Sequence, residues 1–350
     1  MIISFIGGGA MCEAIVKGIL SAKGANNTDI TVAEPSKSRR DELVKLYGIK
    51  ATSSNIEAVK NHADIIVLSI KPQVLTIVLD EMKDSLNPRQ LILSIVAGAK
   101  LDTLIRSTNH ESVIRVMPNT PAQIGSGVSV WTATPKVDSR HKQMASSLLK
   151  PLGIEIYVED ESLIDMSTAL SGSGPAYVFA FVEALIEAGL SLGMPLKLSS
   201  ELAIHTVLGS AKMLDQTGID PAELRKLVTS PGGTTAAALR KLDEEGMKQR
   251  YEARNELWEF CKKDKFIKED LEHHKIGSKE LENLYDTLQL GGAGRWVKGH
   301  FVLVSIFFYS QTLHYCLSHE KLDIGWPKMI ERCYDYFDKN EVGDIIPYWK

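Results

Sequence analysis

Cysteine is scarce in this chain, and neither sign of charge dominates it. Four irregularly spaced cysteines in 350 residues exclude a disulfide framework and favour a reducing compartment. A formal net charge of −4 gives no basic field for nucleic acid. The strongly apolar run at 301–308 falls short of the roughly 20 residues that span a bilayer. We expect no signal peptide ahead of the first strand. These absences favour a cytoplasmic protein with neither nucleic-acid nor membrane partners.

The first twenty residues predict a strand, a glycine turn and a helix. Residues 2–6 form a short apolar run bounded by glycines, as in an interior parallel strand. Gly7 permits a tight turn, and Gly9 lets the backbone approach a pyrophosphate, toward which the next helix directs its N–H groups. Cys12 holds the third glycine position of the fingerprint and is small enough for close packing. The alternative is an ordinary strand-to-helix turn. The predicted dinucleotide loop consists of Gly7, Gly8, Gly9, Ala10 and Met11.

An acidic residue follows the second expected strand, at 29–33. Glu34 lies 22 residues beyond Cys12, close to where an acid binds the adenosine ribose 2′-hydroxyl. Ser36, Lys37 and Arg39 follow at once and offer donors for a 2′-phosphate instead. We favour NADP as the cofactor because of these donors, with NAD left open by Glu34.

Further strands are expected at 63–70, 91–96, 113–117, 128–131 and 154–158. Strands and helices alternate up to about residue 160, which predicts an open α/β sheet of seven or eight strands. From residue 162 the pattern is helical, with glycine-rich helix starts at 171–177 and 229–235. The N–H groups of such a start suit a carboxylate, although ordinary capping is an equal alternative.

Five motifs together resemble the pyrroline-5-carboxylate reductase family over residues 1 to about 247. The motifs are Phe5-Ile6-Gly7-Gly8-Gly9-Ala10-Met11, Lys71-Pro72-Gln73, Arg115-Val116-Met117-Pro118-Asn119-Thr120-Pro121, Gly172-Ser173-Gly174-Pro175-Ala176-Tyr177 and Thr229-Ser230-Pro231-Gly232-Gly233-Thr234-Thr235. The last is the family's signature. Ala10 and Cys12 depart from the family's usual Asn and its usual Gly or Ala.

The resemblance implies reduction of L-1-pyrroline-5-carboxylate to L-proline by NAD(P)H. A protonated imine is already electrophilic, so the reaction needs mainly positioning. By match to the signature, Thr235 takes the place of the catalytic threonine that hydrogen-bonds the ring nitrogen. Gly233 and Thr234, with Ser230 nearby, would hold the substrate carboxylate. No metal is expected, since the cysteines and histidines lack a ligand pattern.

The resemblance also supplies cofactor contacts and an assembly. Asn55 resembles an asparagine that contacts the adenosine half, and Ser69, Lys71 and Pro72 would line the nicotinamide side. Ala97 and Gly98 end the strand at 91–96 and are included in the cofactor site. The family's helical domains interlock in a homodimer that often assembles into decamers.

The resulting fold prediction is α/β. It comprises a Rossmann-like doubly wound dinucleotide-binding domain at 1–161, an all-helical dimerisation and substrate domain at 162–247, and a helical extension of unknown role at 248–350.

Two other function classes stay open at this point. A β-hydroxyacid dehydrogenase or related imine reductase shares the N-terminal fingerprint but usually carries a catalytic lysine on the helix at 176–192, where this chain has none. A non-catalytic cofactor-binding assembly protein is suggested by the tail, whose 100 residues from 251 hold four of the five tryptophans. This change in composition suggests that the tail has a separate origin, by gene fusion or at a junction in the reading frame or the expressed sequence. Helices are expected there at 251–263, 278–290, 296–317 and 326–338.

Overall fold

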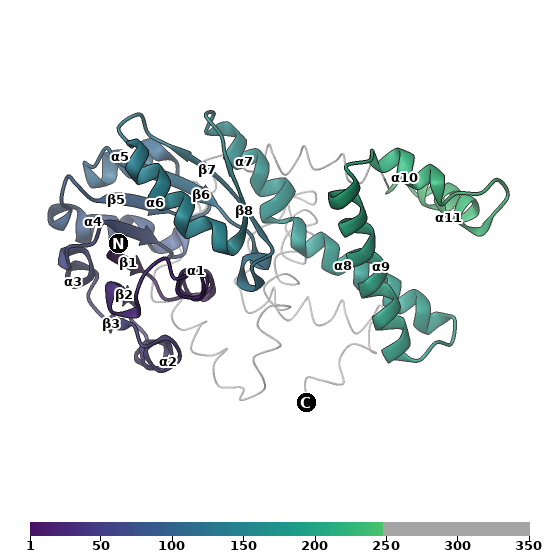
Figure 1. Ribbon diagram of the computed structural model, residues 1–350, viewed down its shortest axis with the longest axis horizontal. Coiled ribbons are helices and arrows are strands. Elements are labelled where there is room, and N and C mark those ends of the chain that lie inside the picture. The colour runs from purple at the N-terminus through teal and green to yellow at the C-terminus, as the bar shows by residue number, and fades with distance from the viewer. Residues whose placement is uncertain (248–350) are drawn as a thin grey trace, which may run out of the picture. The chain divides into compact units, whose positions relative to one another are not determined.

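The structure is a computed structural model, and it describes residues 1–247. The four helices expected between residues 251 and 338 lie outside the described residues. The described chain begins with an α/β region and continues into helices alone, in the order that the sequence predicts (Figure 1).

Eight strands form one sheet in the order β3-β2-β1-β4-β5-β6-β7-β8 (Figure 1). Neighbouring strands are parallel except β6 and β7, which are antiparallel. Because β1 pairs with β2 on one side and β4 on the other, the chain winds outward from β1 in both directions, and a crevice opens at the carboxyl end of β1. The strands are β1 Ile3–Ile6, β2 Ile30–Ala33, β3 Lys50–Thr52, β4 Ile65–Leu68, β5 Leu91–Ser94, β6 Val113–Met117, β7 Gly127–Ala133 and β8 Gly153–Tyr157.

Within the described residues 1–247, six α-helices accompany the sheet and five more follow it. The first six are α1 Ala10–Ser21, α2 Lys37–Tyr47, α3 Asn55–Lys60, α4 Leu75–Met82, α5 Leu101–Thr108 and α6 Ser139–Leu149. The others are α7 Ser162–Ser167, α8 Gly174–Ser191, α9 Leu196–Thr217, α10 Pro221–Leu227 and α11 Thr234–Glu244. A π-helical turn, Thr168–Gly172, separates α7 from α8. Such turns occur often at functional sites.

Alternation along the strands divides the core between the two faces of the sheet. Ile3 and Phe5 of β1 pack with α1, α2 and α6, whereas Ile6 packs with α3, α4 and α5. Both faces of the central strands are therefore buried, as their predominantly apolar sequences require. This arrangement confirms the doubly wound fold.

The sequence missed one strand and misplaced several boundaries. The missed strand is β3, whose residues Lys50–Thr52 are exposed or half-buried and contain no apolar run that would have predicted a strand. The strand expected at 63–70 covers only Ile65–Leu68, because the chain leaves the sheet for the loop that contains Ser69. The first helix begins at Ala10, directly after the extended Gly9.

Candidate functional site

The glycine loop after β1 is shaped to bring backbone close to a ligand. Gly7 has a φ of +99°, and a Cβ there would lie 2.6 Å from the Ser69 carbonyl oxygen. Gly9 is exposed, and a Cβ on Gly9 would have no heavy atom of the described residues within 4 Å. No side chain caps the N-terminus of α1. An open backbone surface ending in uncapped N–H groups fits a dinucleotide pyrophosphate.

Glu34, at the end of β2, reaches back to this loop. Its Oε2 accepts a hydrogen bond from the Gly8 N–H at 2.9 Å, and its Oε1 accepts one from the Ser36 N–H at 2.9 Å. The Ser36 side chain caps α2 by accepting from the Arg39 N–H. The sequence placed Glu34 and Ser36 near the loop, and the structure brings them together there.

The basic residues that follow Glu34 are bound within the chain. Lys37 pairs with Asp41 at 2.7 Å on the surface of α2. The Arg40 side chain donates to the carbonyl oxygens of Glu34 and Pro35. Arg39 turns toward Gly8 and α1. Of the donors from which NADP was favoured, Arg39 is held inside the chain, whereas Lys37 lies in an exposed surface pair and Ser36 caps α2.

The other predicted cofactor residues lie after neighbouring strands. The Ser69 Oγ, after β4, donates to the Gly7 carbonyl oxygen at 2.8 Å. Lys71 and Pro72 follow in the same loop, and the pair Ala97 and Gly98 follows β5 and is exposed. Since these strands are parallel, their carboxyl ends meet at one edge of the sheet, beside the glycine loop.

Asn55 begins α3, and its Nδ2 donates to the Glu81 side chain at 2.9 Å. This bond links α3 to α4. The predicted contact of Asn55 with adenosine stays a prediction.

Cys12 is buried in the first turn of α1 and shares a hydrogen bond with Ser69. Burial raises the pKa of its thiol well above the usual range. The thiol therefore stays protonated and acts as a small packing group, as expected for this position of the fingerprint.

The second glycine-rich motif forms a tight turn into α11. Gly232 has a φ of +71°, and the Gly233 N–H donates to the Ser230 carbonyl oxygen at 3.1 Å. Gly233 is the N-cap residue, and no side chain caps the helix. Thr234 and Thr235 occupy the first two helical positions. An uncapped helix start of this kind suits a carboxylate, and Ser230, Gly233, Thr234 and Thr235 lie in this one turn; their roles toward the substrate stay a prediction.

Two residues between the sheet and the helices gained no role from the sequence. Arg115 on β6 is almost fully buried and binds the carboxylates of Glu161, at 2.8 Å, and Asp165. Asn119, just after β6, donates to the Ser171 carbonyl oxygen at 3.1 Å and accepts from the Val128 N–H at 2.9 Å. Both lie in a motif that supported the family resemblance. The available signals were a charged residue inside an interior strand, for Arg115, and a place just after that strand, for Asn119.

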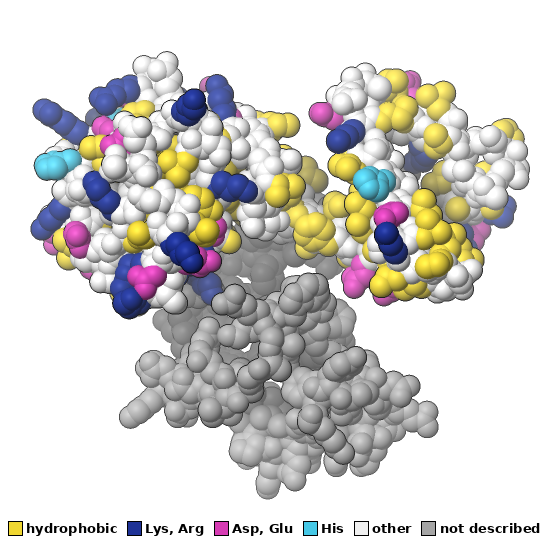
Figure 2. Space-filling model, turned by 60° about the horizontal axis from the view of Figure 1, so that its bottom comes forward, with side chains coloured by type: hydrophobic (Ala, Val, Ile, Leu, Met, Phe, Trp, Pro, Cys, Tyr) yellow, Lys and Arg dark blue, Asp and Glu magenta, His cyan; other side chains and the backbone are white. Residues whose placement is uncertain are grey.

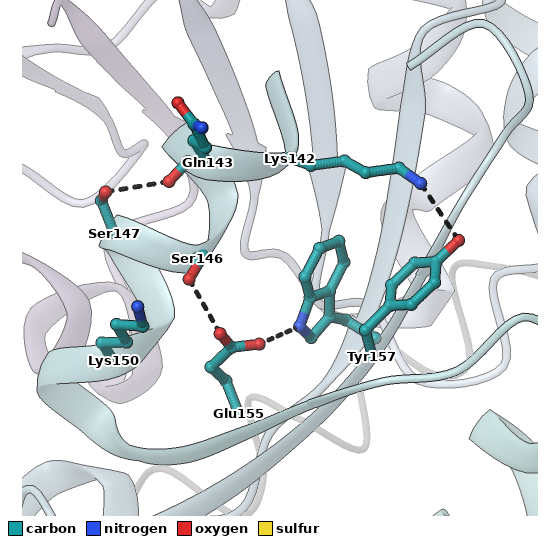
Figure 3. Close-up of a pocket in the computed structure, with 8 residues that line it drawn as sticks. Lys142, Gln143, Ser146, Ser147, Lys150, Glu155 and Tyr157 are labelled. Carbon is teal, nitrogen blue, oxygen red and sulfur yellow. Dashed lines mark hydrogen bonds between the residues drawn. The ribbon is translucent and has the colours of Figure 1, made fainter. Parts of the chain in front are cut away.

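A separate pocket of about 500 Å³ lies between α6 and β8 (Figure 3). The carboxylate of Glu155, one of its lining residues, accepts hydrogen bonds from the Trp131 Nε1–H at 2.5 Å and from the Ser146 hydroxyl at 2.8 Å. The Lys142 ammonium lies 4.6 Å from the centre of the Tyr157 ring. None of the predicted site residues lines this pocket, and its polar groups bond to one another.

Two family models match the described regions. The model for "NADP oxidoreductase coenzyme F420-dependent" matches residues 2–98, and the model for "Pyrroline-5-carboxylate reductase dimerisation" matches residues 161–254. Among similar curated proteins, the pyrroline-5-carboxylate reductase of Pseudomonas aeruginosa is 39% identical over 245 residues, which are 70% of this chain and 89% of that protein. The Arabidopsis thaliana enzyme is 37% identical over 242 residues, or 69% of this chain and 87% of that protein.

Solved structures give the same grouping. A pyrroline-5-carboxylate reductase from Coxiella burnetii aligns with a TM-score of 0.68 and 35% identity, covering 74% of this chain and 97% of that chain. The Plasmodium falciparum pyrroline carboxylate reductase, solved with NADP bound, aligns with a TM-score of 0.68 and 32% identity, covering 75% and 96%.

Proposed function

The chain belongs to the pyrroline-5-carboxylate reductase family, and from this premise we propose which of its residues carry out the reaction. It is an NAD(P)-dependent oxidoreductase that reduces the cyclic imine L-1-pyrroline-5-carboxylate to L-proline, in proline biosynthesis. The observation that carries the assignment of residues is the pair of uncapped, glycine-led helix starts, α1 and α11. One suits a pyrophosphate and the other a carboxylate.

The cofactor residues are those that the sheet gathers at the crevice. The N–H groups at the start of α1 hold the pyrophosphate, and Gly9 leaves room for it. The carboxylate of Glu34 would accept a hydrogen bond from the adenosine ribose. Ser69, Lys71, Pro72, Ala97 and Gly98 line the nicotinamide side, and Asn55 is assigned to the adenosine half. The bound cofactor supplies the hydride.

The substrate residues act through charge and hydrogen bonding. The N–H groups of Gly233 and Thr234, with Ser230 nearby, hold the carboxylate, since a helix start favours an anion. The Thr235 hydroxyl accepts a hydrogen bond from the protonated ring nitrogen and so orients the imine carbon. As the hydride adds to that carbon, the C=N double bond becomes a single bond and the nitrogen keeps its proton. The chain therefore needs no acid–base triad.

Assembly follows from surfaces that the described residues 1–247 leave uncovered. The 18-residue helix α8 contains no buried residue, and apolar side chains gather over the described helices in Figure 2. The stretch Ser162–Ser191 is long and apolar enough to cross a membrane by length and composition alone. A helix buried between two subunits needs the same composition. We assign this surface to a homodimer because the dimerisation model of the family begins at residue 161.

Three further points belong to the proposal. The domain boundaries at 161 and 247, the cytoplasmic location and assembly of dimers into a decamer agree with the family assignment. The NADP oxidoreductase match over residues 2–98 supports NADP as the cofactor, and the Glu34 carboxylate keeps NAD as the alternative. The residues from 248 onward have no assigned role.

Activity of the full chain tests the proposed function. Purified protein should oxidise NAD(P)H only when pyrroline-5-carboxylate is supplied. Turnover of a β-hydroxyacid in its place would favour the runner-up class, and cofactor binding with no turnover would favour a non-catalytic assembly protein. A parallel chain ending at Met247 measures what the remaining residues add.

A further inference from the structure

Gly8, the middle glycine of the loop, is held from both sides of its backbone. Its N–H donates to Glu34 Oε2 at 2.9 Å, and its carbonyl oxygen accepts from the Arg39 Nε–H at 2.7 Å. A Cβ on Gly8 would lie 3.0 Å from the Leu43 side chain and 3.1 Å from the Glu34 Cβ. The loop is therefore fixed by two side chains and has little room to shift.

The rest of the Arg39 guanidinium is bound to acidic residues of α1 and α2. Its two terminal nitrogens donate to Glu13 at 2.5 Å and to Glu42 at 2.8 Å. The Tyr47 hydroxyl donates to the other oxygen of Glu13 at 2.7 Å. The hydrogen bond from Arg39 lowers the pKa of Glu13, while burial and the bond to Glu13 raise the pKa of Tyr47 to about 12. This network ties α1, α2 and the glycine loop together.

Arg39 is thus poorly placed to bind a phosphate. A 2′-phosphate would have to compete with a carbonyl oxygen and two carboxylates for a side chain that is only 21% exposed. Glu34, in contrast, presents a carboxylate between the Gly8 and Ser36 N–H groups. A carboxylate accepts a hydrogen bond from a 2′-hydroxyl and repels a 2′-phosphate.

We infer that Arg39 is a positioning residue, which sets the glycine loop for the pyrophosphate shared by NADH and NADPH, and that Glu34, rather than Arg39, discriminates between them at the ribose 2′ position. The inference rests on the proposed function only in the class of cofactor. Loss of Arg39 then weakens both cofactors by the same factor. Loss of the Glu34 charge changes their ratio.

Equilibrium binding of NADH and NADPH to the full chain tests both halves, without any turnover. We expect Arg39→Met to lower the affinities for NADH and NADPH by the same factor, within twofold, and Arg39→Lys to lower both affinities less. We expect Glu34→Gln to raise the affinity for NADPH relative to NADH at least tenfold, which corresponds to about 1.4 kcal/mol. A tenfold loss confined to NADPH in Arg39→Met would show a phosphate ligand and overturn the inference. An unchanged ratio in Glu34→Gln would do the same.

Three additions make the result decisive. Arg106→Met removes a surface ion pair with Asp102 on α5 and should change neither affinity. Tyr47→Phe loosens Glu13 without touching Arg39, so it should weaken both cofactors slightly and equally even if Arg39→Met fails to fold; a loss limited to one cofactor would count against the inference. AMP and 2′,5′-ADP as competing probes report the ribose site directly. If these patterns hold while pyrroline-5-carboxylate is not reduced, the proposed reaction fails and the assignment of Arg39 and Glu34 stands.

Discussion

Asn119 donates from its side-chain amide to the carbonyl oxygen of Ser171, 52 positions later in the chain. The bond joins the loop after β6 to the π-helical turn that precedes α8. Gly172, the next residue, fits there because a Cβ would lie 2.8 Å from the Met117 side chain. A small set of contacts therefore connects the cofactor edge of the sheet to the helices that follow.

Asn119→Asp should disturb this connection while keeping the size of the side chain. The carboxylate still accepts from the Val128 N–H but faces the Ser171 carbonyl oxygen without a proton. We expect a loss of about 1–3 kcal/mol in stability. We also expect a fall in kcat of about tenfold to a hundredfold from misplaced groups. Thermal unfolding and steady-state kinetics measure both. Asn87→Asp, in an exposed turn, is the matched control, and equal effects in the two variants would contradict the role of Asn119.

Thr235→Ala should lower kcat more than it weakens cofactor binding. Loss of one hydrogen bond to a charged nitrogen costs about 1.5–3 kcal/mol, or roughly ten- to a hundredfold in rate. Thr235→Ser keeps the hydroxyl and should retain most of the activity. Thr217→Ala, at the exposed end of α9, is the control. Turnover at the wild-type rate in Thr235→Ala would remove this residue from the mechanism.

Gly189→Ala should destabilise the pairing of α8 with α9. The added methyl would lie 2.5 Å from the Ser199 Oγ, which belongs to a buried side chain. Overpacking of this kind costs about 1–3 kcal/mol. A Cβ on Gly209 in α9 would meet no heavy atom of the described residues outside its own helix backbone within 4 Å, and the higher helix propensity of Ala should stabilise the helix by up to about 1 kcal/mol. Chemical denaturation compares the two, and equal stabilities would refute the contact.

His110 should make stability fall in mild acid. Burial lowers the pKa of its ring below 6.5, while the ring nitrogen bonds to the Gln90 carbonyl oxygen at 2.7 Å. Below pH 6.5 the unfolded chain takes up a proton that the folded chain does not, so the contribution is present above that pH and is lost as the pH falls toward the folded pKa. Melting temperatures of the wild type should drop between pH 7 and 5 more steeply than those of His110→Gln. Parallel curves would contradict this assignment.

Phe179→Asp should dissociate the proposed dimer. Phe179 on α8 is 63% exposed in the single chain, and a carboxylate there cannot be buried against a second apolar helix without a large cost. Light scattering with activity across a dilution series should show a monomer of reduced activity. Lys212→Asp, a charged position on α9, is a control for the change of charge. A fully active wild-type monomer would sink the dimer proposal.

The sequence predicted the parts of this fold that carry uninterrupted apolar runs. β1, β4 and β5 are buried on both faces, so their composition reports their place directly. β3 is only partly buried and has no such signature. The loops were predictable where backbone geometry demands glycine, as at Gly7.

Side-chain partners were harder to foresee, because they depend on which way a flexible side chain turns. Arg39 illustrates this. Its place after Glu34 suggested a phosphate ligand, yet its donors bond to Gly8, Glu13 and Glu42. Arg115 is similar, since its acidic partners lie 46 and 50 positions away. No local pattern in a single sequence shows such pairings.

The exposed apolar surface of α8 has a consequence for folding during synthesis. The strands and their covering helices are complete by Tyr157, so they leave the ribosome first and can close their core alone. The helix α8 emerges afterwards, and none of its residues is buried among the described residues 1–247. Each newly synthesised subunit thus passes through a stage in which a folded α/β domain is followed by an exposed apolar helix. During that interval, local polypeptide concentration and chaperones, rather than the sheet's stability, decide between productive pairing and aggregation.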